Sequence, residues 1–125
     1  MNKRFVELAI EEAKKSIYEQ RMGCIIFNKK IIISSGHNYA LKNRKRLNPK
    51  FQKWKGSIHA EVDAILNAKS NLKNCHLLII RINKKNEFRL ALPCNKCRQF
   101  IEHVGIKKVF YSINTYPHII KLKEF

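Results

Sequence analysis

The first third of the chain changes from a helical to an extended pattern of apolar residues. In residues 5–20 the apolar side chains recur at helical spacing, with acids and lysines between them, which predicts an amphipathic helix. Residues 24–27 and 31–35 are runs of apolar and β-branched residues, and the polar segment 28–30 separates them. Because such runs joined by a short polar segment favour a hairpin, we predict two paired strands here.

The second half of the chain carries two more helical patterns. Residues 58–69 have an apolar stripe at helical spacing, and Ser57 is a suitable N-cap in front of them. A further helix is predicted to begin near Pro93 and to end at Gly105. Residues 97–104 again place apolar side chains at helical spacing, and glycine is favoured just after a helix.

Extended segments lie between and after these helices. Residues 76–82 form a nearly continuous apolar run, which is typical of a buried strand, and a polar turn follows it at 83–86. Further strands are predicted at 108–112 and 118–122. A parallel crossover needs about a dozen or more residues, whereas only residues 113–117 separate these two strands. We therefore predict the last two strands to be antiparallel.

The order of the predicted elements favours an α/β fold. Helix, two strands, helix, strand, helix and strand form a sheet that helices cover. The 125 residues suit one domain spanning residues 1–125.

Two short motifs specify a reaction. H-A-E at residues 59–61 is followed by P-C-N-K-C at residues 93–97. Zinc binds nitrogen and sulfur ligands in a tetrahedron, and a catalytic site takes three of them from protein and leaves the fourth position to water. His59, Cys94 and Cys97 supply such a set, so we predict a catalytic zinc site.

Glu61 has the chemistry of a proton carrier beside that metal. Zinc lowers the pKa of its bound water, so a neighbouring carboxylate takes up one proton and returns it to a leaving amine. Glu61 also falls on the apolar stripe of residues 58–69, where burial of a carboxylate is costly. A chemical role explains this position better than folding does.

The pair Cys94 and Cys97 has simpler explanations as well. The spacing C-x-x-C also occurs in redox pairs and in structural zinc sites. A redox pair does not need H-A-E, and a structural zinc needs a fourth ligand, for which Cys75, His76 and His103 have no matching spacing. The sequence therefore favours the catalytic site over both.

With these motifs, the sequence resembles the zinc-dependent cytidine deaminase superfamily over residues 23–111. The resemblance implies a three-layer fold, with a central mixed five-stranded sheet flanked by helices. It implies that His59, Cys94 and Cys97 bind one Zn²⁺ per chain and that Glu61 is the catalytic residue. It also implies substrate-binding positions, which are Asn38, Ala60 and Pro93.

Two features near the motifs imply a small pyrimidine substrate. The sequence C-R-Q at residues 97–99 is similar to that of small pyrimidine nucleoside deaminases, although those usually have cysteine in place of His59. The predicted antiparallel last pair of strands resembles the topology of free-nucleoside deaminases and of certain bacterial toxin deaminases. In tRNA-editing and deoxycytidylate deaminases a helix is typically inserted between these two strands. We expect deamination of a cytosine-type base in a nucleoside or nucleotide.

The charge of the chain favours a polymeric substrate instead. Lysine and arginine number 26 against 9 acids, for a net charge of +17, and such a surface attracts phosphate. The densest basic stretch is residues 42–55, which also offers aromatic side chains on which bases could stack. Candidate phosphate or nucleic-acid contacts in it are Lys42, Arg44, Lys45, Arg46, Lys53, Trp54 and Lys55. The alternative interpretation of this stretch is a solvated, lysine-rich loop.

Three functions therefore stay open. The first is the deaminase of a free nucleoside or nucleotide, the second a deaminase of cytosine in DNA or RNA or of adenosine in tRNA, and the third a zinc-bearing nucleic-acid-binding module without turnover. Related enzymes are commonly dimers or tetramers, so we expect a homo-oligomer. With two cysteines assigned to metal and no long apolar segment, we expect no secretion, no membrane partner and an intracellular location in cytoplasm or nucleus.

Overall fold

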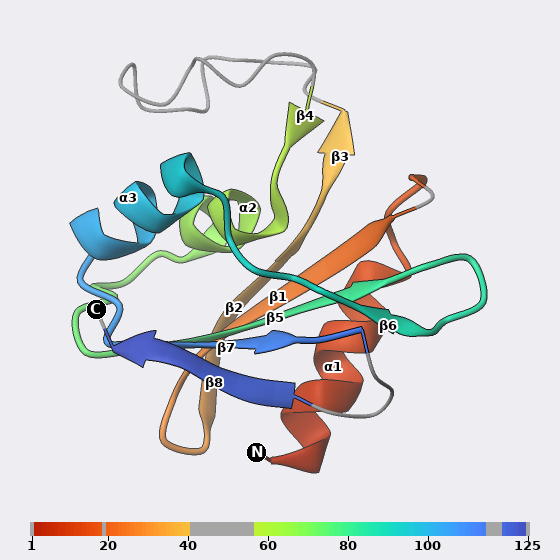
Figure 1. Cartoon of the computed structure of the whole chain (residues 1–125). Helices are drawn as coiled ribbons and strands as arrows, with labels where there is room; N and C mark the ends of the chain where they lie inside the picture. Colours follow the sequence, from red (N-terminus) through yellow and green to blue (C-terminus); the bar gives the residue numbers. More distant parts are fainter. Residues whose placement is uncertain (1, 19, 41–56, 115–118, 125) are drawn as a thin grey trace.

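The structure is a computed structural model that describes residues 2–18, 20–40, 57–114 and 119–124. A mixed sheet lies between helices on its two faces (Figure 1). The strand order is β2-β1-β5-β7-β8, with β5 and β7 parallel and the other neighbours antiparallel. These strands are β1 (Arg21–Asn28), β2 (Ile31–His37), β5 (His76–Ile82), β7 (Lys108–Ser112) and β8 (Ile119–Glu124). The predicted five-stranded mixed sheet and its antiparallel last pair are confirmed.

Three two-residue strands were not predicted. Strand β6 (Phe88–Arg89) adds a sixth strand by pairing with β5 beyond the predicted polar turn. Strands β3 (Tyr39–Ala40) and β4 (Ser57–Ile58) form a separate ladder. Segments this short carry too little alternation to be recognised from sequence.

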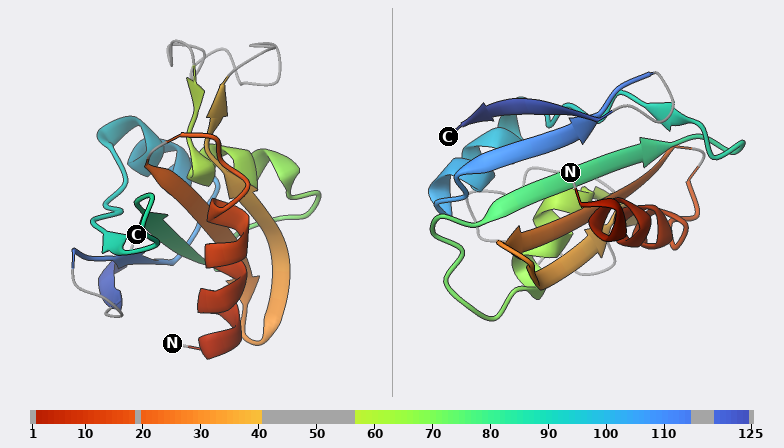
Figure 2. Two further views of the ribbon diagram at one scale, coloured as in Figure 1. Left: turned by 90° about the vertical axis from the view of Figure 1, so that its right-hand side faces the viewer. Right: turned by 90° about the horizontal axis from the view of Figure 1, so that it is seen from below.

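The helices form the outer layers. Helix α1 (Lys3–Ala13) packs on one face of the sheet, and α2 (Ala60–Asn67) and α3 (Asn95–His103) lie on the other (Figure 2). None of the helices in the described part of the chain is long and apolar enough to cross a membrane.

The central strand β5 is buried on both faces, as its apolar run predicted. Leu78, Ile80 and Ile82 pack in the cluster beneath α1, whereas Leu77 and Ile79 pack in the cluster with α2 and α3. Because side chains alternate along a strand, odd-numbered positions of β5 face the layer of α2 and α3.

Two glycines bring helices close to the sheet. A Cβ atom added to Gly23 would lie 2.0 Å from the carbonyl oxygen of Ala9 in α1. A Cβ added to Gly36 would lie 2.3 Å from the backbone nitrogen of Ala64 in α2 and 2.8 Å from the carbonyl oxygen of Ala60. Only glycine permits such approach of backbone to backbone.

The predicted boundary of the first helix is wrong. Helix α1 ends at Ala13, not at residue 20. The N–H groups of Lys15 and Ser16 each donate to a carbonyl three residues back, which tightens the last turn before the chain leaves the helix. Ile17 belongs to the helical pattern of the sequence but is 85% exposed, so it adds nothing to the core.

The starts of the other two helices also differ from prediction. Helix α2 begins at Ala60 with His59 at the N-cap, because Ser57 belongs to β4; it ends at Asn67, not at residue 69. Helix α3 begins at Asn95 with Cys94 at the N-cap, after the predicted start near Pro93. Gly105 follows this helix with a φ of 85°, as its predicted end requires.

Candidate metal centre and active site

The three predicted ligands lie at the N-termini of two helices. His59 is the N-cap residue of α2, directly after β4, whose pairing with β3 fixes the entry to the helix. Cys94 is the N-cap residue of α3, and Cys97 is buried in its first turn. Residues far apart in the sequence thus meet where two helices begin, and positive helix termini favour thiolate ligands.

The distances among these side chains fit one zinc ion. The Nδ1 atom of His59 lies 3.2 Å from Sγ of Cys97 and 3.8 Å from Sγ of Cys94. All three ligand atoms lie within 4.8 Å of one another. In a tetrahedron with the usual zinc bond lengths, ligand nitrogen and sulfur are about 3.5 Å apart. The donor set therefore suits zinc in both chemistry and size.

Glu61 is buried next to this cluster. It lies in the first turn of α2 and is 2% exposed. Among the described residues its Oε1 atom has no hydrogen-bond partner. Burial raises the pKa of Glu61, and its own backbone amide and the charge of His59 offset this only in part. An orphaned buried oxygen is costly for folding alone, so it suits a group that meets a water or a substrate.

The three ligand side chains also polarise one another. A hydrogen bond from Cys97 is the main cause that lowers the pKa of Cys94 to about 3. The same hydrogen bond raises the pKa of Cys97, and the contact with Cys94 raises the pKa of His59. The cluster thus concentrates negative charge on Cys94, and thiolate is the form that binds metal.

A hollow of about 420 Å³ lies beside His59. This volume is within the range of about 300–1,000 Å³ that small-molecule sites occupy. The residues that line it are Tyr18, Gln20, Met22, Asn38, His59 and Arg81. They come from the segment before β1, from β1 and β5, and from the ends of β2 and β4.

Asn38 lines this hollow, but its amide also holds the wall together. Its Oδ1 accepts a hydrogen bond of 2.9 Å from the backbone N–H of Met22, and its Nδ2 donates one of 3.0 Å to the carbonyl of Gln20. The sequence pattern had pointed only to substrate contact. The structure adds a structural role, and substrate contact stays a prediction.

The other predicted contacts are less well defined. Ala60 and Pro93 are buried beside the ligands and do not line the hollow. The basic candidates lie outside the described residues, namely Lys42, Arg44, Lys45, Arg46, Lys53, Trp54 and Lys55. Sequence reasoning missed Arg81, although a charged side chain that continues the alternation of an apolar strand was a signal for it.

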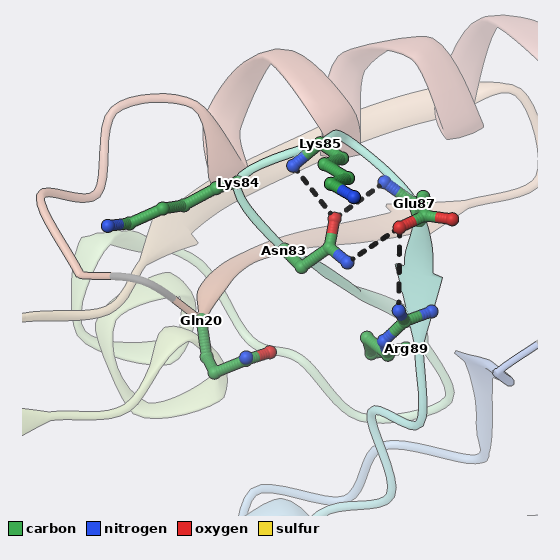
Figure 3. Close-up of a pocket in the computed structure, with 6 residues that line it drawn as sticks. All are labelled: Gln20, Asn83, Lys84, Lys85, Glu87 and Arg89. Atoms are coloured by element: carbon green, nitrogen blue, oxygen red, sulfur yellow. Dashed lines mark hydrogen bonds and ion pairs between the residues drawn. The ribbon is translucent and has the colours of Figure 1, made fainter.

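A second hollow of about 300 Å³ shares Gln20 with the first one (Figure 3). Its other lining residues are Asn83, Lys84, Lys85, Glu87 and Arg89. Asn83 closes the turn after β5, because its Oδ1 accepts from the N–H groups of Lys85 and Glu87. Arg89 pairs with Glu87 at 3.5 Å. Part of this basic surface is therefore engaged in holding its own turn.

Comparisons with known proteins agree with this geometry. Residues 1–113 match the family profile described as the cytidine and deoxycytidylate deaminase zinc-binding region. The fold is similar to that of cytidine deaminase from Burkholderia pseudomallei, with a TM-score of 0.66 and 15% identity over 98% of this chain and 93% of that one. It is also similar to dCMP deaminase from the cyanophage S-TIM5, with a TM-score of 0.57 and 18% identity over 89% and 84%.

A further similar structure is the diaminohydroxyphosphoribosylaminopyrimidine deaminase and reductase from Thermotoga maritima. Its TM-score is 0.53 and its identity 23%, over 85% of this chain and 27% of that one. A comparison with curated protein sequences gives no match. The matched zinc-binding region and the cluster of three ligands together confirm one zinc ion per chain.

Proposed function

The chain belongs to the cytidine and deoxycytidylate deaminase family, and we propose that it hydrolyses a cytosine-type base of a nucleoside or nucleotide to the uracil type with release of ammonia. The observation that supports this best is Glu61, whose buried and unpartnered Oε1 lies beside a metal-binding cluster. A structural zinc site has no use for such a carboxylate.

In this proposal His59, Cys94 and Cys97 hold the zinc ion. When bound, zinc lowers the pKa of an attached water and so supplies a nucleophile near neutral pH. With zinc bound, Glu61 would hold the proton released as the water oxygen bonds to the ring carbon that bears the amino group, and would deliver a proton to the exocyclic amino nitrogen, so that the C–N bond breaks and ammonia leaves. Because α2 buries Glu61, its proton is exchanged with the reacting groups rather than with bulk water.

A second candidate is a deaminase that acts on a base within a polynucleotide. The net charge of +17 supports it, as does the basic hollow next to the first one (Figure 3). Phosphate attraction of this kind is independent of base sequence. We place it second because charge describes the whole surface, whereas Glu61 and the ligands belong to the reacting site.

Ammonia release by the zinc-loaded protein tests the proposal. The panel contains cytidine, deoxycytidine, their monophosphates, adenosine, guanine, single-stranded DNA and tRNA, and Glu61→Ala is the blank. We expect release from a small pyrimidine, no release by the blank, and one zinc per chain in both proteins. Release from polymers alone supports the second candidate. If no substrate releases ammonia and the Glu61→Ala variant binds nucleic acid as the wild type does, the result supports a binding module.

A further inference from the structure

Arg81 is a charged residue on a face of β5 that is otherwise apolar. Leu77 and Ile79 precede it on this face and belong to the core cluster of α2 and α3. Arg81 lies opposite Met22 in the pairing of β1 with β5, and both residues line the hollow beside His59. Strand β5 therefore places a cation in the wall of the candidate active site, where its apolar face leaves the core.

The guanidinium of Arg81 is held by neutral groups. Its Nε donates to Oε1 of Gln20 at 3.0 Å, and its Nη1 donates to the carbonyl of Leu90 at 3.4 Å. Its backbone N–H donates to the hydroxyl of Ser112, which is fully buried and itself donates to the carbonyl of Arg89. The position of Arg81 is thus fixed from both its backbone and its side chain.

Among the described residues no carboxylate forms an ion pair with Arg81, and its Nη2 makes no hydrogen bond. The neighbouring Arg89, which pairs with Arg81 in the β5–β6 register, does have a carboxylate partner in Glu87. A guanidinium that neutral groups hold, and that has no carboxylate partner in the part of the chain the structure describes, presents the fork that binds phosphate through charge-assisted hydrogen bonds.

We propose that Arg81 binds the phosphate of a pyrimidine mononucleotide, so that the substrate is the nucleotide rather than the nucleoside. This inference rests on the proposed deaminase function and defines its substrate class. The base would lie toward His59 and the phosphate toward the β5 wall of the same hollow, whose volume of about 420 Å³ suits a small ligand. Arg81 is then a specificity-determining residue.

Steady-state kinetics of zinc-loaded variants test this role. The substrates are CMP, dCMP, cytidine and deoxycytidine, and the variants are Arg81→Gln, Arg81→Lys and the control Arg89→Gln. The control removes the same charge from the adjacent strand without touching the hollow beside His59. We expect Arg81→Gln to lower kcat/KM for the monophosphates by about 10- to 100-fold, the usual effect of losing a hydrogen bond to a charged group. The nucleosides should change less than about threefold, and Arg81→Lys should recover part of the loss.

Equal losses of kcat/KM on nucleosides and nucleotides would overturn the proposal, because they would mean that Arg81 only positions the hairpin of β5 and β6. The proposal would also be overturned if Arg89→Gln lowered kcat/KM for the monophosphates as much as Arg81→Gln does. The positive charge of the surface in general would then explain the preference for phosphate. A short single-stranded oligonucleotide with one cytosine separates the two sources of phosphate. If only this oligonucleotide is deaminated, and Arg81→Gln weakens that reaction, the ligand is a strand phosphate and the mononucleotide assignment is wrong.

Binding of the products gives a readout that does not depend on turnover. Calorimetry with UMP and uridine should show that the wild-type protein prefers UMP, and that Arg81→Gln loses this preference while Arg89→Gln keeps it. If no substrate is deaminated but the preference for UMP depends on Arg81, the proposed function fails and the phosphate site stands. If deamination occurs and no preference is seen, the phosphate site fails alone.

Discussion

The two faces of the sheet each bury a glutamate on a helix, and the two carboxylates have opposite surroundings. Glu12 on α1 is 8% exposed and Glu61 on α2 is 2% exposed. Glu12 accepts hydrogen bonds of 2.9 Å from Nδ1 of His37 and from Nζ of Lys15, and one of 3.3 Å from Ser35. Within the described residues, Oε1 of Glu61 has no partner.

These surroundings shift the pKa values of the two carboxyl groups in opposite directions. Burial opposes the charge of Glu12, but His37 and Lys15 outweigh it, so the pKa of Glu12 lies below its ordinary value. Burial dominates at Glu61 and raises its pKa. Burial alone therefore does not mark a catalytic group. A buried carboxylate oxygen that the described residues leave without a partner favours a chemical role, because its cost needs a different explanation.

The largest expected difference between the two faces is in catalysis. Glu61→Gln should lower turnover by about 10²- to 10⁴-fold, the usual range for loss of a general acid and base. Glu12→Gln should leave turnover per folded molecule within about twofold, since Glu12 lies in the other layer. Stopped assays on folded, zinc-loaded protein measure both values. Comparable losses in the two variants would remove the distinction between a reacting and a structural carboxylate.

The surroundings of Glu61 could be anticipated from the sequence, whereas those of Glu12 could not. The stripe of residues 58–69 placed Glu61 among apolar positions, and H-A-E with P-C-x-x-C placed it beside metal ligands. Glu12 also lies on an apolar stripe, three residues after Ala9 and seven after Phe5, so spacing alone does not separate it from Glu61. Its partner His37 approaches from another strand, and such contacts across the fold leave no periodic signal.

The sequence of helices and strands along the chain and the antiparallel last pair were also predictable, because periodicity and connection length act locally along the chain. The ends of the helices were less predictable from the sequence. Ile17 has helical spacing yet faces solvent, and Ser57 has cap chemistry yet pairs in a strand. The role proposed for Arg81 rests on its register opposite Met22 and on the lack of a carboxylate partner among the described residues, which only the assembled sheet defines.

The next difference concerns how closely each helix approaches the sheet. Gly36→Ala would place a Cβ 2.3 Å from backbone of α2, so we expect a loss of about 3 kcal/mol in the free energy of unfolding. Because α2 carries Glu61 and follows His59, turnover per folded molecule should fall as well. Gly23→Ala, which meets α1 at 2.0 Å, should destabilise similarly but leave the turnover of folded molecules intact.

Chemical denaturation and activity normalised to folded protein measure this pair of variants. The matched glycines separate loss of folding from loss of site geometry, since both crowd a helix against the same sheet (Figure 2). Equal losses of normalised turnover would mean that the two helical layers move together. The face with α2 would then hold the site no more directly than the face with α1.

The smallest expected effect is the contribution of Glu12 to stability and its dependence on pH. Glu12→Gln should lower the free energy of unfolding by about 1–2 kcal/mol near neutral pH, because hydrogen bonds to a charged group are lost. Glu11→Gln is the matched control, since Glu11 is exposed and pairs only with Lys14 in the described part of the chain, at 3.6 Å. Such a surface pair contributes little.

The sign of the pH dependence follows from the lowered pKa of Glu12. The charged carboxylate stabilises the folded chain fully above its unfolded pKa of 4.5, and this contribution is lost as the pH falls through the lower folded value. Unfolding free energies of wild type, Glu12→Gln and Glu11→Gln, measured from pH 7 down to pH 3 under one metal condition, should therefore converge as the pH decreases. A gap between wild type and Glu12→Gln that stays constant through this range would mean that shape, not charge, holds Glu12 against His37 and Lys15. The contrast with Glu61 would then rest on hydrogen-bond partners alone.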